Sequence, residues 1–212
     1  MNSVDRVFGM FGSNSKVEKE GSNGEESLNS SFGAARTPQY IISNGKEASI
    51  FASSMEKYPT YAPCLWFEMG SARLNTIDSS NHFTGDGRVV AKTTLVCMKY
   101  GSWGPELHKY LVLGTRLDQL IIKRIVTLRG SYVEVQATRF QTCYITTYEQ
   151  RGDKIYFTFS FEKIIDAKLQ YDNTGQKLGG AVGFEFDYTR AAENSAPDLG
   201  FMNEFDNDAT DI

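Results

Sequence analysis

Residues 157–188 read FTFSFEKIIDAKLQYDNTGQKLGGAVGFEFDY, and apolar and polar side chains alternate at both ends of this stretch. Because successive side chains of a strand point to opposite faces, the alternation predicts a strand at each end. The aromatic row Phe157, Phe159 and Phe161 is expected to face the core. Between the two strands, residues 172–180 carry the glycine and asparagine that are typical of turns.

Segments of the same kind fill most of the chain after residue 62. They are CLWFEM (64–69), RVVAKTTLVCMKY (88–100), DQLIIKRIVTLRG (118–130) and SYVEVQATRFQTCYITTY (131–148). The RGD at 151–153 is expected to form the next turn rather than a receptor-binding motif. Many strands with short turns and one helix are typical of sandwiches and barrels. The sequence therefore predicts a mainly β fold, a two-sheet β-barrel or sandwich with one short α-helix.

The helix is predicted at residues 105–113. Pro105 suits a first helical position, where its missing N–H leaves no hydrogen bond unmade. Leu107, Tyr110 and Leu111 repeat at i, i+3 and i+4 and give the helix one apolar face. Gly114 can adopt the left-handed conformation that ends many helices. A helix this short is marginal alone, so it is expected to pack on the sheet.

Composition divides the chain into three parts. Residues 1–37 are rich in Ser, Gly, Asn and Glu, and we expect them to form a flexible N-terminal extension. Residues 38–191 are expected to form the single barrel domain. Residues 192–212 carry six acidic and no basic residues, and are expected to form an acidic C-terminal tail. Residues 41–190 carry 18 basic and 15 acidic residues, too small an excess to predict nucleic-acid binding.

Membrane insertion and the general secretory route are not expected. No apolar run approaches the roughly 20 residues that a membrane helix needs. The apolar segment VFGMFG (7–12) is shorter than the core of a signal peptide, which takes about 7–15 residues. If the protein leaves the cell, we expect another apparatus to export it.

No pattern predicts a catalytic, metal or cofactor site. The three cysteines are widely spaced among strand-like residues, which favours buried free thiols over a disulfide framework. Of the two histidines, His108 lies in the helix, and His82 lies in a loop with Asp78 and Asp86 that lacks the spacing of a calcium loop. DNTGQKLGG (172–180) lacks the Gly-x-x-x-x-Gly-Lys-Ser/Thr pattern of a phosphate loop. We expect no cofactor, no metal and no enzymatic activity.

Two sets of polar residues are candidates for contacts with a partner. The loop 70–87 (GSARLNTIDSSNHFTGDG) is a long polar excursion, and such loops are often functional. Its candidate residues are Arg73, Asn75, Asp78, Asn81, His82, Phe83 and Asp86. The second set lies on strand faces expected to point away from the core, as a lumen or subunit interface: Thr94, Glu134, Gln136, Thr138, Thr158 and Glu162. The strand at the edge of a sheet has unpaired backbone N–H and C=O groups. Pairing with neighbouring copies of the chain is one way to satisfy them.

Two stretches resemble the haemolysin-coregulated proteins (Hcp), the tube subunits of bacterial type VI secretion. GPELHKYLVLGTRLDQLIIKRI (104–125) is similar to the family's helix start, helix, glycine and strand. Residues 157–188 resemble its C-terminal layout, in which an alternating strand, a tyrosine near an Asp-Gly-type loop and a Gly-Gly precede a closing segment. That segment ends here in Phe186 and Asp187, where the family has Trp-Asp or a similar pair.

The resemblance implies a tube subunit. Members of the family form six-membered rings, each subunit having two sheets folded into a barrel with the helix at one side. The rings stack head to tail as the inner tube within a contractile sheath tipped by a spike, and the lumen holds small secreted cargo. The expected partners are thus copies of the chain itself, sheath and spike or baseplate proteins, and cargo. The protein would be cytoplasmic during assembly and exported without a signal peptide, and the loop 70–87 would reach the next ring.

The N-terminal extension and the acidic tail depart from the family pattern and suggest a divergent member. A phage tail tube protein, which shares the fold, is one alternative. A monomeric or dimeric β-sandwich that binds a ligand or peptide through the glycine-rich loop 172–183 is another. A ring in solution would distinguish the tube subunit from the binding module. An enzyme would require a pocket in which His82 or His108 lies beside an acid.

Overall fold

The computed structural model describes residues 40–45, 49–53, 58–73, 76–77, 83–84, 89–128, 131–171, 176–194, 196–199 and 201. Every described residue belongs to the unit Thr37–Ile212. The predicted extension 1–37 therefore lies outside the described residues.

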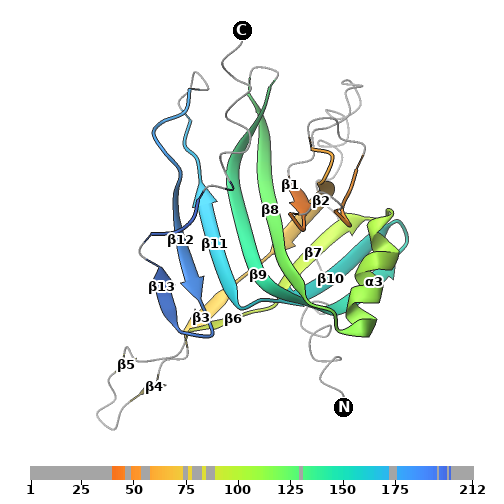
Figure 1. Ribbon diagram of the computed structural model, residues 1–212, viewed down its shortest axis with the longest axis horizontal. Coiled ribbons are helices and arrows are strands. Elements are labelled where there is room, and N and C mark those ends of the chain that lie inside the picture. Colours follow the sequence, from red (N-terminus) through yellow and green to blue (C-terminus); the bar gives the residue numbers. More distant parts are fainter. Residues whose placement is uncertain are drawn as a thin grey trace, which may run out of the picture. The chain divides into compact units, whose positions relative to one another are not determined.

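Strands dominate the described chain (Figure 1). The strands before the helix are β1 (Tyr40–Ser43), β2 (Ala62–Glu68), β3 (Ser71–Arg73), β4 (Thr76–Ile77), β5 (Phe83–Thr84), β6 (Val89–Ala91) and β7 (Thr94–Lys99). The helix is α3 (Trp103–Leu113). The strands after it are β8 (Leu117–Leu128), β9 (Ser131–Arg151), β10 (Lys154–Ser160), β11 (Lys163–Lys168), β12 (Val182–Asp187) and β13 (Ala192–Asn194).

Six of these strands close into a ring. β1 pairs with β2 and β8, β2 with β7, β7 with β10, β10 with β9, and β9 with β8, all antiparallel. A closed ring leaves no strand edge unpaired within it, which is how barrels avoid edge-to-edge association. The predicted barrel is therefore confirmed, and Gly152 and Asp153 of the RGD form the two-residue turn between β9 and β10.

β9 belongs to two parts of the sheet because it is 21 residues long. Its C-terminal half, from Tyr144, pairs with β10 inside the ring, whereas residues 136–141 pair with β11. β11, β12 and β13 then continue as a branch that extends beyond the ring. Register shifts in the β8–β9 and β10–β9 ladders mark bulges, and bulges bend a strand and increase its twist.

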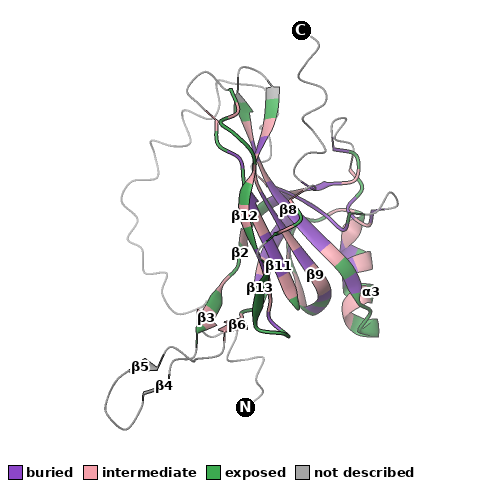
Figure 2. Cartoon of the chain, turned by 60° about the vertical axis from the view of Figure 1, so that its left-hand side comes forward, coloured by how far each residue is buried: buried purple, intermediate pink, exposed green. Residues whose placement is uncertain are grey.

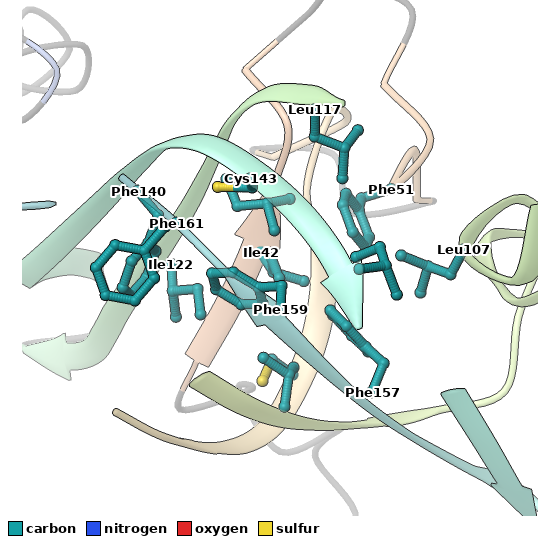
Figure 3. Packing of buried hydrophobic residues seen from close by; sticks show 14 of the residues in the cluster. Ile42, Phe51, Leu107, Leu117, Ile122, Phe140, Cys143, Phe157, Phe159 and Phe161 are labelled. Carbon is teal, nitrogen blue, oxygen red and sulfur yellow. The ribbon is translucent and has the colours of Figure 1, made fainter. Parts of the chain in front are cut away.

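The main core fills the inside of the ring (Figure 3). The aromatic row from the sequence is fully or nearly fully buried there: Phe157 and Phe159 have no exposed surface, and Phe161 has 7%. Phe140 of β9 packs edge-on against Phe159 and Phe161, with ring centroids 5.0 and 4.8 Å apart. Leu107 brings helix α3 onto this cluster, as the apolar face of the helix predicted.

A second apolar cluster lies on the other face of the central strands. It contains Ile41, Tyr58, Tyr61, Ile121, Ile125, Ala137, Ile165, Ala167, Leu169 and Phe201. β8, β9 and β11 are therefore buried on both faces, which Figure 2 shows as purple running along these strands. Exposed residues gather on β13 and on the outer side of α3.

The structure differs from the sequence prediction at three boundaries. The predicted strand 88–100 is two strands, β6 and β7, because the chain leaves one ladder for another at Lys92 and Thr93. Helix α3 begins at Trp103, so Pro105 is its third residue, still among the first four that lack an intrahelical partner for N–H. Within the predicted tail, residues 192–194 form β13 and Phe201 is buried, so this part of the tail packs on the domain.

Candidate functional site

The long polar loop of the sequence contains two pairs of short antiparallel strands, and residues 70–92 are here called the arm. β3 pairs with β6, Ser71 opposite Ala91, and β4 pairs with β5, Thr76 opposite Thr84. The backbone N–H of Lys92 donates to the carbonyl oxygen of Gly70 at 2.9 Å and closes its base. The predicted extended loop therefore contains two short ladders.

The candidate residues of the arm fall into two groups. Arg73 is exposed at the end of β3, and Phe83 opens β5 opposite Ile77. The other five candidates lie outside the described residues: Asn75, Asp78, Asn81, His82 and Asp86.

A hydrogen bond joins the base of the arm to the far end of the sheet. The hydroxyls of Ser71, on β3, and Tyr188, which follows β12, bond to each other although 117 residues separate them. The Tyr188 ring is 9% exposed and packs edge-on against Phe161 and Phe186, with centroids 5.6 and 4.9 Å away. This contact was not predicted, because a tyrosine at a strand end gives no signal of its distant partner.

The predicted polar strand faces are mostly buried within the subunit. Thr94 and Thr138 have no exposed surface, Glu134 has 4% and Thr158 has 8%. The Thr138 hydroxyl donates to Asp166 Oδ1 at 2.7 Å, and the hydroxyl of Thr158 bonds to those of two threonines on β9. The expectation that these four line an outer surface is therefore wrong, because all four side chains are buried within the subunit.

Gln136 and Glu162 remain accessible. Gln136 is half-buried and donates to Asp166 Oδ1 at 3.1 Å, and Glu162 is exposed. Their part in an interface between subunits stays a prediction.

A bulge explains the position of Glu134. By simple alternation, Glu134 would face away from Ala137, three residues along the strand. On β8, Lys123 and Ile125 share a face, and their partners on β9 are Ala137 and Glu134. The register shift in this part of the ladder adds one residue to β9, which turns Glu134 to the face of Ala137.

Glu134 forms a buried ion pair on that face. Lys123 Nζ lies 3.0 Å from Glu134 Oε2, and the two side chains are 0% and 3% exposed. The same ammonium donates to the carbonyl oxygen of Phe201 at 3.0 Å and lies 5.5 Å from the centre of the Tyr61 ring. Burial, together with the Glu134 carboxylate, raises the pKa of Tyr58 in this cluster to about 12. Through these contacts Lys123 links β8 to β9 and to Phe201 near the end of the described chain.

The chain after β13 lies across the second cluster, and residues 196–199 and 201 are here called the strap. Arg139 Nη1 lies 3.4 Å from the Asp198 carboxylate, and its guanidinium lies 4.1 Å from the centre of the Phe201 ring. Leu199 packs half-buried on the second cluster, and Phe201 is 6% exposed. Two apolar residues in a predicted acidic tail, Leu199 and Phe201, are the sequence signal that could have indicated this packing.

Several large apolar side chains are exposed on the described surface. At the end of α3, Val112 and Leu113 are 71% and 66% exposed, and on β12 Val182 and Phe184 are 69% and 45% exposed. Patches of this kind on an isolated subunit are candidates for contacts with other chains.

The cysteines and the described histidine give no reactive centre. Cys64, Cys97 and Cys143 are buried free thiols, and burial raises the pKa of Cys64 and of Cys143 to about 12. His108 is exposed and stacks on Tyr148 with centroids 5.0 Å apart. Among the residues that the structure describes, no helix has the length and apolar character needed to cross a membrane.

Comparison with known proteins identifies the fold. No family model and no curated protein matches the sequence. A solved type six secretion system protein matches with a TM-score of 0.64 and 15% identity, over 74% of this chain and 100% of its own. Hcp1 of E. coli EAEC 042 matches with a TM-score of 0.57 and 14% identity, over 72% of this chain and 99% of its own. Hcp1 of Salmonella typhimurium matches with a TM-score of 0.55 and 16% identity, over 74% and 99%. The chain therefore has the fold of the Hcp proteins, with a sequence that differs from theirs at most positions.

Proposed function

We propose that the protein is the structural, non-catalytic subunit of the inner tube of a type VI-like contractile secretion apparatus. Six copies form a ring, and rings stack head to tail. The observation that carries this proposal is that the structural match extends over 99–100% of the solved type six secretion system protein and of the two solved Hcp1 chains.

The exposed apolar residues support contacts between copies. Val182 and Phe184 lie at the beginning of β12, on the part that β13 does not cover, since β13 pairs only with residues 185–187. An unpaired strand edge therefore lies next to exposed apolar side chains, and monomeric proteins usually cover both features. Contact with a neighbouring copy in the ring would cover the edge and bury the side chains.

The arm supports contacts between rings. A two-stranded sheet is marginally stable in water by itself, and the described strands of the arm form two such sheets, of which β3–β6 packs partly on the main core. A neighbouring ring would supply the surface that the arm lacks. Sheath and spike or baseplate proteins would be the further partners, and small cargo proteins would travel in the lumen. In this role the protein is assembled in the cytoplasm and exported without a signal peptide.

Mass measurement of the purified protein by light scattering, combined with negative-stain images, tests the proposal. We expect a particle of six times the 23.7 kDa of one chain, annular in end view, and tubes at high concentration. A monomer or dimer at every concentration, with or without a baseplate protein, would contradict the proposal and favour a binding module.

A shortened arm tests the contact between rings. Arg73 and Val89 are opposite each other in the β3–β6 ladder, so an Asn-Gly turn can replace residues 74–88 and keep the register. A matched control replaces residues 172–176 with the same turn, between the bridged pair Tyr171 and Lys177. We expect the first variant to form rings without tubes and the control to form both. Normal tubes from the first variant would show that the arm does not join rings.

A further inference from the structure

We infer that Tyr188 is a positioning residue that sets the direction of the arm through its hydrogen bond to Ser71. The inference rests on the proposed function only in its last step, where a correctly directed arm is needed for rings to stack. The hydrogen bond, the packing of the tyrosine and the separate sheet of β3 and β6 are features of the single subunit.

The base of the arm packs partly on the main core through Val89 and Ala91 of β6, and on the other strand Ser71 adds its hydrogen bond to Tyr188. Within the described residues, β3 and β6 pair only with each other and form a sheet separate from the nine-stranded one. Two short links, at residues 69–70 and 92–93, join the arm to β2 and β7. Both links lie outside any strand, so rotation about them would break no hydrogen bond of the large sheet.

Tyr188 is held firmly, which makes it a suitable anchor. Its ring is fixed edge-on between Phe161 and Phe186, and Phe161 belongs to the main core. Its backbone N–H donates to the carbonyl oxygen of Glu162 at 2.9 Å. The phenol oxygen therefore has a defined place at the end of β12, and a hydroxyl that bonds to it is located relative to the core.

The position of Ser71 gives the bond its effect. Ser71 is the first residue of β3, directly after the link at Gly70, so the bond acts at the base of the arm. From Ser71 to Arg73 the chain rises about 7 Å at the spacing of an extended strand. A tilt of about 10° at the base would therefore already move Arg73 by about 1.2 Å.

Tyr188→Phe removes the hydroxyl and keeps the ring, so it tests the bond without disturbing the core. The first readout is hydrogen exchange of the amides in β3 and β6. Ser71 pairs with Ala91 at the base of this ladder, so losing its anchor should let the base open more often. A typical neutral hydrogen bond corresponds to about a fivefold change in an equilibrium, so we expect about fivefold faster exchange there. Exchange in the β8–β9 ladder should not change. Ser71→Ala should give the same increase, and the double variant no more than either one.

Tyr144→Phe is the matched control. Tyr144 is 40% exposed on β9, so its substitution also removes one phenol hydroxyl but leaves the arm untouched. The second readout is assembly: light scattering for rings and electron microscopy for tubes. We expect Tyr188→Phe to form rings of normal mass but fewer and shorter tubes, whereas Tyr144→Phe should behave as the unaltered protein does.

The outcomes separate this inference from the proposed function. Unchanged exchange in Tyr188→Phe would show that the bond does not hold the arm, and would overturn the inference. Faster exchange with normal tubes would show that arm direction does not limit stacking, which also overturns it. If the unaltered protein forms no rings, the proposed function fails, and the exchange rates still decide whether Tyr188 holds the arm.

Discussion

The buried pair of Lys123 and Glu134 gives the sharpest test of the packing. Glu134→Leu would remove the carboxylate that lies 3.0 Å from the Lys123 ammonium, in a site where neither side chain is more than 3% exposed. The ammonium would keep the Phe201 carbonyl oxygen and the face of the Tyr61 ring, neither of which carries a full negative charge. Water cannot replace the lost partner, so the substitution would leave a desolvated charge.

Removing one partner of a buried ion pair costs about 3–5 kcal/mol of unfolding free energy. That is a large share of the total unfolding free energy of a domain, which is roughly 5–15 kcal/mol. At about 2–4 °C per kcal/mol for a domain of this size, Glu134→Leu should lower the melting temperature by about 6–20 °C. The double variant with Lys123→Met should recover most of the loss, because an apolar pair of similar volume is often neutral or stabilising.

Urea denaturation followed by circular dichroism measures these free energies. Asp118→Ala is the control, because Asp118 pairs with Arg116 at 3.3 Å with both side chains more than half exposed, and exposed pairs contribute at most about 1 kcal/mol. A loss below about 1 kcal/mol in Glu134→Leu would contradict the reasoning. So would a double variant as unstable as the single one, since then the charge would not be the cause.

Gly114→Ala should cost about 1 kcal/mol in urea denaturation, because Gly114 ends α3 at φ 61° with open space around it; Gly180→Ala, also in open space but without a positive φ, should cost less. Phe201→Ala should lower the unfolding free energy by about 3 kcal/mol and make the strap accessible to protease, whereas an unchanged digestion pattern would show that Phe201 does not anchor it. Burial raises the pKa of the Cys64 and Cys143 thiols from an ordinary 9.0 to about 12. Their contribution to stability is therefore complete below pH 9 and lost as the pH rises toward 12, which urea midpoints at rising pH would show. Mass spectrometry should detect no alkylation of these two thiols by iodoacetamide at pH 8 in the folded protein, and rapid labelling there would contradict their burial.

Local patterns in the sequence are sufficient to predict the barrel and its helix. Phe157, Phe159 and Phe161 alternate without interruption, and the structure buries all three in one core. Gly114 ends the helix in the left-handed conformation that its residue type predicted. In these places, the side chains that define the element are neighbours along the chain, so short windows contain the necessary information.

The same reasoning fails where the fold depends on distant pairing. Glu134 lies between two valines, an alternation that predicts a surface position, but a bulge turns its side chain toward Lys123. β8, β9 and β11 are covered on both faces, so a polar side chain on these strands need not be exposed to solvent. The length and polarity of the loop indicate arm residues such as Arg73 as candidates, whereas Tyr188, which bonds to Ser71 in that loop, directly follows the distant strand β12 and gives no such signal.

The place of β1 in the ring has a consequence for the order of folding. β1 lies between β2 and β8, so it joins the earliest part of the ring to a strand that is made only after the helix. A growing chain therefore carries β1 and β2 for some time with exposed edges, before β8 can pair. Such non-local pairing slows folding and exposes intermediates to association. For a protein that also assembles with its own copies, premature association during synthesis would compete with correct closure of the ring.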